Sequence, residues 1–285
     1  MIVEIVSIGY GVVSMIGWGC GDFLAKRAVG SVDYYKLLLY TQLVSLVPVF
    51  LLAAIFTPPL PSSLGTIIFI IASGICSFSA VFFFFKALSV GKASVVAPVT
   101  STSAIVAIAL SFAVLGETLS FLQASCIALV MSGLLIISVG PSSEKKSDAG
   151  VPYALACMFS AGLSSILIKL VSADIGAIGT LFFNRSLVSV MLLMMFPFFG
   201  SRLYGRVSLK PVVLVGLSEF VGYFGFVVGI AVGIVSIVTP ISSSSPAVTV
   251  ILAQVFLKEE LTQIQKMAVL LIMLGILLLS ILSSS

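Results

Sequence analysis

The chain has 285 residues, of which 60% are apolar and only 8% are charged, and its formal net charge is +4. A soluble domain of this length needs far more polar surface, so the composition excludes a soluble globular protein. The absence of histidine removes the usual proton shuttle and the commonest metal ligand, and the small positive charge does not indicate a nucleic-acid surface.

Apolar runs long enough to span a bilayer follow one another from end to end of the chain. They cover 5–29, 34–56, 65–87, 93–115, 119–139, 151–172, 176–199, 209–231, 234–256 and 262–282. Because lipid cannot hydrogen-bond the backbone, each run must satisfy its own N–H and C=O groups, and we expect ten transmembrane helices. The four cysteines fall in four different runs without metal-ligand spacing, so we interpret them as packing residues.

The first run carries the stretch WGCGDFLAK at 18–26. Trp18, the only tryptophan, lies in the middle of the run instead of at a membrane interface, which suggests the wall of a cavity. Asp22 and Lys26 have the i, i+4 spacing of a local ion pair. The alternative is that Asp22 faces a cavity and binds substrate.

The fourth and ninth runs contain copies of one motif. VGKASVVAPVTSTSAIVAIALSFAVLGETLSFLQ at 90–123 aligns without a gap with VGIVSIVTPISSSSPAVTVILAQVFLKEELTQIQ at 232–265, at an offset of 142. The first and sixth runs repeat at an offset of 143, where Gly19 and Lys26 match Gly162 and Lys169. Membrane composition alone does not place Pro, Gly, Glu, Gln and Ser in one common register.

The chain is therefore predicted to hold two copies of a five-helix unit, 1–139 and 151–285, joined by the polar linker 140–150. An odd number of helices per copy makes the second copy enter the membrane from the opposite side. The predicted fold class is an all-α integral membrane protein with ten transmembrane helices as two inverted repeats, and substrate sites in such proteins lie between the repeats.

Proline and hydroxyl side chains interrupt the two matching runs at APVTSTS (97–103) and TPISSSS (239–245). We expect Pro98 and Pro240 to kink their helices, because proline removes a backbone hydrogen bond. The hydroxyls either allow close helix packing or line a translocation path. The candidate cavity residues of these segments are Thr100, Ser101, Ser242 and Ser243.

Two charges fall near the centres of the seventh and eighth runs, Arg185 and Glu219. A charge at a helix centre costs roughly 2.5–3.5 kcal/mol on insertion scales, so each requires a reason. The two residues either form a buried structural ion pair, or Glu219 couples protons or binds a substrate amine while Arg185 faces a substrate carboxylate. Tyr223 is one turn from Glu219 and is a further candidate.

Glu117 and Glu259 occupy matching positions after the fourth and ninth runs. A carboxylate near a helix N-terminus is favoured by the exposed N–H groups, and we interpret both as structural.

The stretch at 18–26, together with APVTSTSAIVAIALSFAVLGETLSFLQASCIALVMSGLLIIS at 97–138, resembles the EamA family of the drug/metabolite transporter superfamily. The resemblance covers essentially the whole chain. One departure is that Thr41-Gln42 stands where the family often has an arginine in its second helix, while this chain has Asn184-Arg185 in its seventh. The resemblance implies secondary transport, and commonly export, of amino acids or other small metabolites.

We accordingly expect a secondary transporter that works by alternating access in the plasma membrane. The expected partners are a small-molecule substrate, the lipid bilayer and a candidate coupling proton. We expect a monomer and no enzymatic activity, nucleic acid, metal or cofactor. The alternatives are a non-transporting membrane scaffold and an ion or metal carrier, although no catalytic set, carboxylate ring or filter loop supports them.

Lysine and arginine are distributed unequally between the predicted sides. Twelve lie in or beside the links that follow the odd-numbered runs, and only Lys169 lies on the other side. The positive-inside rule then places both termini outside, whereas the resemblance implies termini inside.

Overall fold

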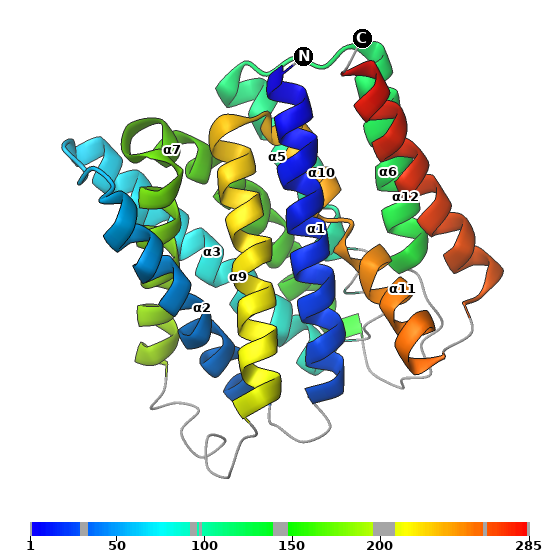
Figure 1. Ribbon diagram of the computed structural model, residues 1–285, viewed down its shortest axis with the longest axis horizontal. Helices are drawn as coiled ribbons and strands as arrows, with labels where there is room; N and C mark the ends of the chain where they lie inside the picture. The colour runs from blue at the N-terminus through cyan, green and yellow to red at the C-terminus, as the bar shows by residue number, and fades with distance from the viewer. Residues whose placement is uncertain are drawn as a thin grey trace.

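The computed structural model describes residues 2–28, 34–91, 96, 99–138, 148–195, 209–258 and 261–283. These residues contain no strand. The helical elements are α1 (Ile2–Ala28), α2 (Tyr34–Phe56), α3 (Leu64–Val90), α5 (Ser103–Leu110), η1 (Ser111–Leu115), α6 (Phe121–Ser138), η2 (Asp148–Gly150), α7 (Val151–Met194), α9 (Leu209–Val232), α10 (Val235–Ser242), α11 (Ser245–Leu257) and α12 (Gln263–Leu282). Figure 1 shows both ends of the chain on one face, which we call the terminus face.

Eight helical stretches of the described chain are long and apolar enough to cross a membrane, and Val99–Leu115 is a shorter apolar helix. One of the eight, α7, has 44 residues and is broken at Gly176, whose φ of 70° and ψ of 173° are not helical. Large apolar side chains such as Phe121, Leu60 and Leu209 are exposed on the outside of the molecule. An apolar exterior of this kind suits a lipid environment and not water.

The contact between α6 and α12 is reciprocal. A Cβ added at Gly133 would lie 2.7 Å from the carbonyl oxygen of Ala268, and one at Gly275 would lie 2.9 Å from that of Cys126. Both glycines, and the residues that they contact, correspond at the repeat offset of 142. The residue numbers run in opposite directions along the two helices, so α6 and α12 are antiparallel.

Two other helix pairs show the same exchange of partners. Gly74 of α3 packs against Leu187 of α7, and Gly216 of α9 packs against Val44 of α2. Likewise Gly19 of α1 meets Val248 of α11, while the corresponding contact joins Gly162 of α7 to Val106 of α5. A contact that recurs with its partners exchanged is the mark of a two-fold relation between the units that make it.

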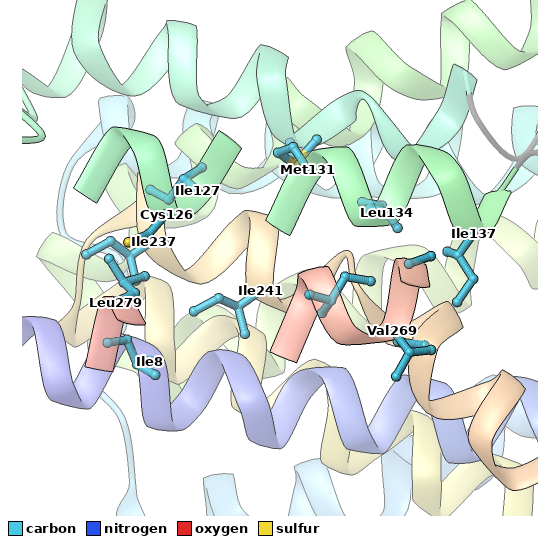
Figure 2. Packing of buried hydrophobic residues seen from close by; sticks show 14 residues of the cluster. Ile8, Cys126, Ile127, Met131, Leu134, Ile137, Ile237, Ile241, Val269 and Leu279 are labelled. Carbon is cyan, nitrogen blue, oxygen red and sulfur yellow. The ribbon is translucent and has the colours of Figure 1, made fainter. Parts of the chain in front are cut away.

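A large apolar core lies where α6 and α12 meet α1 and α10. Figure 2 shows Leu134 and Met131 of α6, Ile241 of α10 and Ile8 of α1 within this cluster. The cluster holds together helices from both halves of the sequence at one end of the molecule.

The serine run forms a break between α10 and α11. Ser244 leaves helical geometry with a ψ of 11°, and its hydroxyl donates to the carbonyl of Pro240 at 2.9 Å. Pro240 itself lies inside α10, and the interruption falls less than one turn after it. Its repeat partner Pro98 lies outside the described residues.

Two charged side chains stabilise the junction of α9 and α10 on the terminus face. Lys169 donates to the carbonyls of Ile230, Ala231 and Gly233 at 2.8–3.2 Å, at the C-terminal end of α9. Glu117 accepts hydrogen bonds from the backbone N–H groups of Val235 and Ser236 at 2.7 and 2.9 Å. The helix dipole favours a positive charge at the C-terminal end of α9 and a negative charge at the N-terminal end of α10. Lys169 and Glu117 supply these charges.

The helix that Glu117 caps differs from the expectation, because α10 belongs to the other half of the chain instead of following Glu117 in sequence. The hydroxyl of Ser236 also donates to this carboxylate, and it lies 2.6 Å from the hydroxyl of Ser111. The first and second halves are thus joined on the terminus face by a polar contact. Glu259 lies outside the described residues.

Candidate functional site

A cavity of about 450 Å³ opens between the two halves of the chain. It reaches the last two turns of α1, at Asp22 and Ala25, and the beginning of α2, at Leu37. Because α1 starts at the terminus face, these helix ends lie toward the opposite face. Its lining residues are Trp18, Asp22, Ala25, Leu37, Leu38, Thr41, Gln42, Ala80, Val81, Phe84, Phe85, Thr100, Ser101, Ser103, Cys157, Val215, Glu219, Ser243, Ser245 and Pro246.

A second cavity of about 280 Å³ adjoins the first and lies deeper among the helices. Its further lining residues include Ser77, Ser165, Asn184, Arg185, Tyr223 and Thr239. The residues common to both linings are Trp18, Gln42, Ala80, Val81, Ser103, Glu219 and Ser243, so we treat the two as the outer and inner parts of one central cavity. Toward the terminus face the cavity ends at α10, every residue of which is buried.

Two carboxylates face this cavity from neighbouring helices. Glu219 of α9 lies against α1, where a Cβ added at Gly21 would be 3.2 Å from its Oε1 atom. Asp22 is the next residue of α1, and its side chain is exposed to the cavity. Within the described parts of the chain, neither carboxylate has a hydrogen-bond or ion-pair partner. The side chain of Lys26, the predicted partner of Asp22, lies outside the described residues.

Arg185 lines the inner part of the cavity from the second arm of α7 and is 6% exposed. Its Nε atom donates to the hydroxyl of Ser45 at 3.0 Å, and its guanidinium lies over the ring of Tyr223, 4.7 Å from the centroid. Its Nη2 atom is buried without a hydrogen-bond partner. Glu219 does not come within hydrogen-bond reach of Arg185 among the described residues, but the two charges attract each other electrostatically. The structural pair and the role in transport considered from the sequence both stay predictions.

A hydrogen-bond network fixes the side chains beside Arg185. The Nδ2 atom of Asn184 donates to Ser73 and Ser77 at 3.1 Å, and its Oδ1 accepts from the hydroxyl of Tyr223. Ser77 in turn lies 2.7 Å from the hydroxyl of Ser164. These partners satisfy Asn184, whereas Arg185 keeps one buried N–H donor without a partner.

The repeat relates the polar residues of the cavity in pairs. At offsets of 142 and 143, which the reciprocal glycine contacts support, Asp22 corresponds to Ser165, Glu219 to Ser77 and Gln42 to Arg185. All six residues line the central cavity. We call Asp22, Glu219 and Gln42 the acidic half-site, and Ser165, Ser77 and Arg185 the cationic half-site.

The structure brings together most of the residues that the sequence analysis selected. The candidates that line the central cavity are Trp18, Asp22, Thr100, Ser101, Arg185, Glu219, Tyr223 and Ser243. Ser242 does not line it, because its buried hydroxyl donates to the backbone carbonyls of Val238 and Thr239 at 2.6 and 3.2 Å.

Gln42 was missed as a site residue, although a polar amide in an apolar run is a signal of function. Its side chain is 5% exposed, lines both parts of the cavity, and has a buried Oε1 atom without a hydrogen-bond partner. Its correspondence to Arg185 in the repeat would have revealed it. Among the described residues, no group of three His, Cys, Asp or Glu side chains could hold a metal ion.

Comparisons with known proteins agree with this arrangement. A solved crystal structure shares the fold, with a TM-score of 0.81 over 97% of this chain and 98% of the other at 16% identity. An uncharacterized protein of Methanocaldococcus jannaschii is 46% identical over 69 residues, or 24% of this chain, and the match spans about half of that relative. The EamA-like transporter family matches residues 5–139 and again 148–281. The chain is therefore a multi-pass integral membrane protein and belongs to the EamA-like transporter family.

Proposed function

We propose that the protein is a secondary active transporter that exports small organic metabolites, with amino acids as the preferred class, by alternating access. The observation that carries the proposal is the central cavity, in which charged groups from both halves of the chain converge inside an otherwise apolar protein. Ionisable residues at such depth are costly and mark substrate or ion pathways in membrane proteins. A cavity of about 450 Å³ has the size of a small-molecule site.

The proposed architecture has ten spans in two inverted halves. The two arms of α7 on either side of Gly176 supply two spans, and Val99–Leu115 supplies another beside the seven remaining long helices. The reciprocal, antiparallel contact between α6 and α12 supports a two-fold axis in the membrane plane. In transporters built this way, one repeat moves against the other around a fixed site.

The two faces of the cavity supply the asymmetry that alternating access requires. The face away from the termini is open at α1 and α2, whereas α10, Glu117 and Lys169 close the terminus face. We propose that transport exchanges these two arrangements. By the positive-inside rule the termini lie outside, so the open cavity faces the cytoplasm of the plasma membrane, where an exporter takes up its substrate.

The polar groups suit a molecule with both an amine and a carboxylate. Arg185 offers an unused N–H donor to a carboxylate, and Glu219 offers an acceptor to an ammonium group. Charge-assisted hydrogen bonds of this kind are roughly twice as strong as neutral ones. We further propose that the protein works as a monomer and that the carboxylates also bind the coupling proton.

Exchange of labelled amino acids in proteoliposomes tests the proposal. The purified protein should exchange at least one of a neutral, an acidic and a basic amino acid above the level of protein-free vesicles. The Glu219→Gln variant should lose this exchange. Glu4→Gln is the matched control, because Glu4 bonds Gln123 of α6 away from the cavity and should leave exchange intact. Exchange by the wild type no faster than in empty vesicles for the whole panel would contradict the proposal.

A further inference from the structure

We infer that the transported molecule carries one carboxylate and two cationic nitrogen groups, which is the charge pattern of a basic amino acid such as lysine. This inference rests on the proposed transport function and names the substrate class of the same cavity.

The charges of the cavity are the first reason. The acidic half-site presents two carboxylates, Asp22 and Glu219, while the cationic half-site presents only Arg185, which attracts Glu219 electrostatically. Among the described residues that line the cavity, two acids therefore stand against one base. An α-amino acid with a neutral side chain uses Arg185 and one carboxylate, and it leaves the second carboxylate uncompensated. An uncompensated charge inside a membrane protein is costly, so a ligand with one further positive charge matches the cavity best.

Each half-site also contains one buried polar atom without a hydrogen-bond partner. The Oε1 atom of Gln42 is an acceptor without a partner, in a side chain that is 5% exposed and lines the same cavity as the carboxylates. The Nη2 atom of Arg185 is a donor without a partner in a side chain that is 6% exposed. Buried polar groups in native proteins are normally hydrogen-bonded, so these atoms await a donor at the acidic half-site and an acceptor at the cationic half-site.

The order of the groups along the cavity fits an extended molecule. Arg185 lines only the inner part, Glu219 and Gln42 line both parts, and Asp22 lines only the outer part. A substrate carboxylate at Arg185 would therefore place its α-ammonium near Glu219 and its second cationic group near Asp22. The rings of Trp18 and Phe84 border the space through which the aliphatic chain between the two nitrogens would pass.

The test compares lysine with norleucine, which has the same four-carbon side chain without the terminal ammonium group. In proteoliposomes the wild type should exchange lysine with a kcat/KM at least tenfold above that for norleucine. Asp22→Asn should lower lysine exchange more than norleucine exchange, so that the ratio of the two kcat/KM values falls to about one. Asp174→Asn is the matched control, because Asp174 accepts a hydrogen bond from Thr66 outside the cavity and should keep the lysine preference.

Each other outcome has a definite meaning. If the wild type exchanges no amino acid, the proposed transport function fails. If it exchanges norleucine as well as lysine, the inference about substrate class is wrong while the transport function stands. If Asp22→Asn abolishes proton movement with both substrates and leaves the ratio of lysine to norleucine exchange unchanged, Asp22 binds a proton and not a substrate nitrogen. That result would also overturn the inference. The wild-type ratio decides the question even if Asp22→Asn does not fold.

Discussion

The two half-sites of the cavity occupy equivalent places in the repeat but carry different chemistry. On one side, Ser77 and Ser164 fill the space between α3 and α7 with a 2.7 Å contact between their hydroxyls. At the equivalent place between α9 and α1, Glu219 stands opposite Gly21, and the missing side chain of Gly21 leaves room for the carboxylate. Equivalent helix pairs therefore hold a hydrogen-bonded serine pair in one place and a glutamate without a hydrogen-bond partner in the other.

This difference shows which part of the protein the repeat constrains. The glycines that bring helices together recur in both halves, because close packing needs a small residue at both equivalent contacts. The charged groups that face the cavity do not recur. A substrate whose two ends differ in charge needs a binding site whose two sides differ in charge. The two halves of the chain therefore differ in the residues that would bind the substrate.

Removing the acid is expected to have the largest effect on transport. Glu219→Gln replaces a charge-assisted interaction worth about 1.5–3 kcal/mol, so lysine kcat/KM should fall about 10- to 100-fold. The protein should still fold, because Arg185 keeps its hydrogen bond to Ser45 and its contact with the Tyr223 ring. Flux and melting temperature measured on one preparation check this, and a large fall in melting temperature would restore a structural role for Glu219.

Removing the cation should have a smaller and more selective effect. Arg185→Gln makes this position identical to its counterpart Gln42 and removes the donor to a substrate carboxylate. Lysine kcat/KM should fall about tenfold, the equivalent of about 1.4 kcal/mol, while exchange of cadaverine, which is lysine without the carboxylate, should not change. An equal loss for both compounds would show that Arg185 does not bind the carboxylate.

Equivalent glycine substitutions at the helix contacts, in contrast to substitutions in the half-sites, should have equal effects in the two halves. Gly133→Ala and Gly275→Ala each place a Cβ within 3 Å of a backbone carbonyl at the contact of α6 and α12. Each should lower the free energy of unfolding by about 1–3 kcal/mol, and the two values should be similar. Thermal unfolding in detergent measures both, and a loss confined to one variant would contradict the two-fold relation.

Much of the fold could be predicted because the repeat is a long-range signal within one chain. The register of Gly19 with Gly162 already implied equivalent helices, and the structure shows that both make equivalent contacts. Trp18, Asp22, Arg185 and Glu219 stood out because polar and unusual residues are rare in apolar runs.

Other parts of the site could not be predicted, since they depend on how distant helices meet. Which serine of the run faces the cavity depends on the break after Ser242, and Ser243 lines the cavity while Ser242 bonds the backbone. The partner of Glu117 is α10, 118 residues away in sequence, and local helix rules point to the nearest helix instead. Gln42, in contrast, could have been predicted from its correspondence to Arg185 in the repeat.

The most direct test makes the two half-sites alike. In the double variant Asp22→Ser with Glu219→Ser, both carboxylates become the residues found at their counterparts Ser165 and Ser77. The measurement is lysine exchange in proteoliposomes, with the melting temperature taken on the same protein. We predict that exchange is lost while the folded protein is retained, because neither carboxylate makes a hydrogen bond to the described part of the chain. Undiminished lysine exchange by the folded double variant would contradict the account that the acidic half-site recognises the transported molecule.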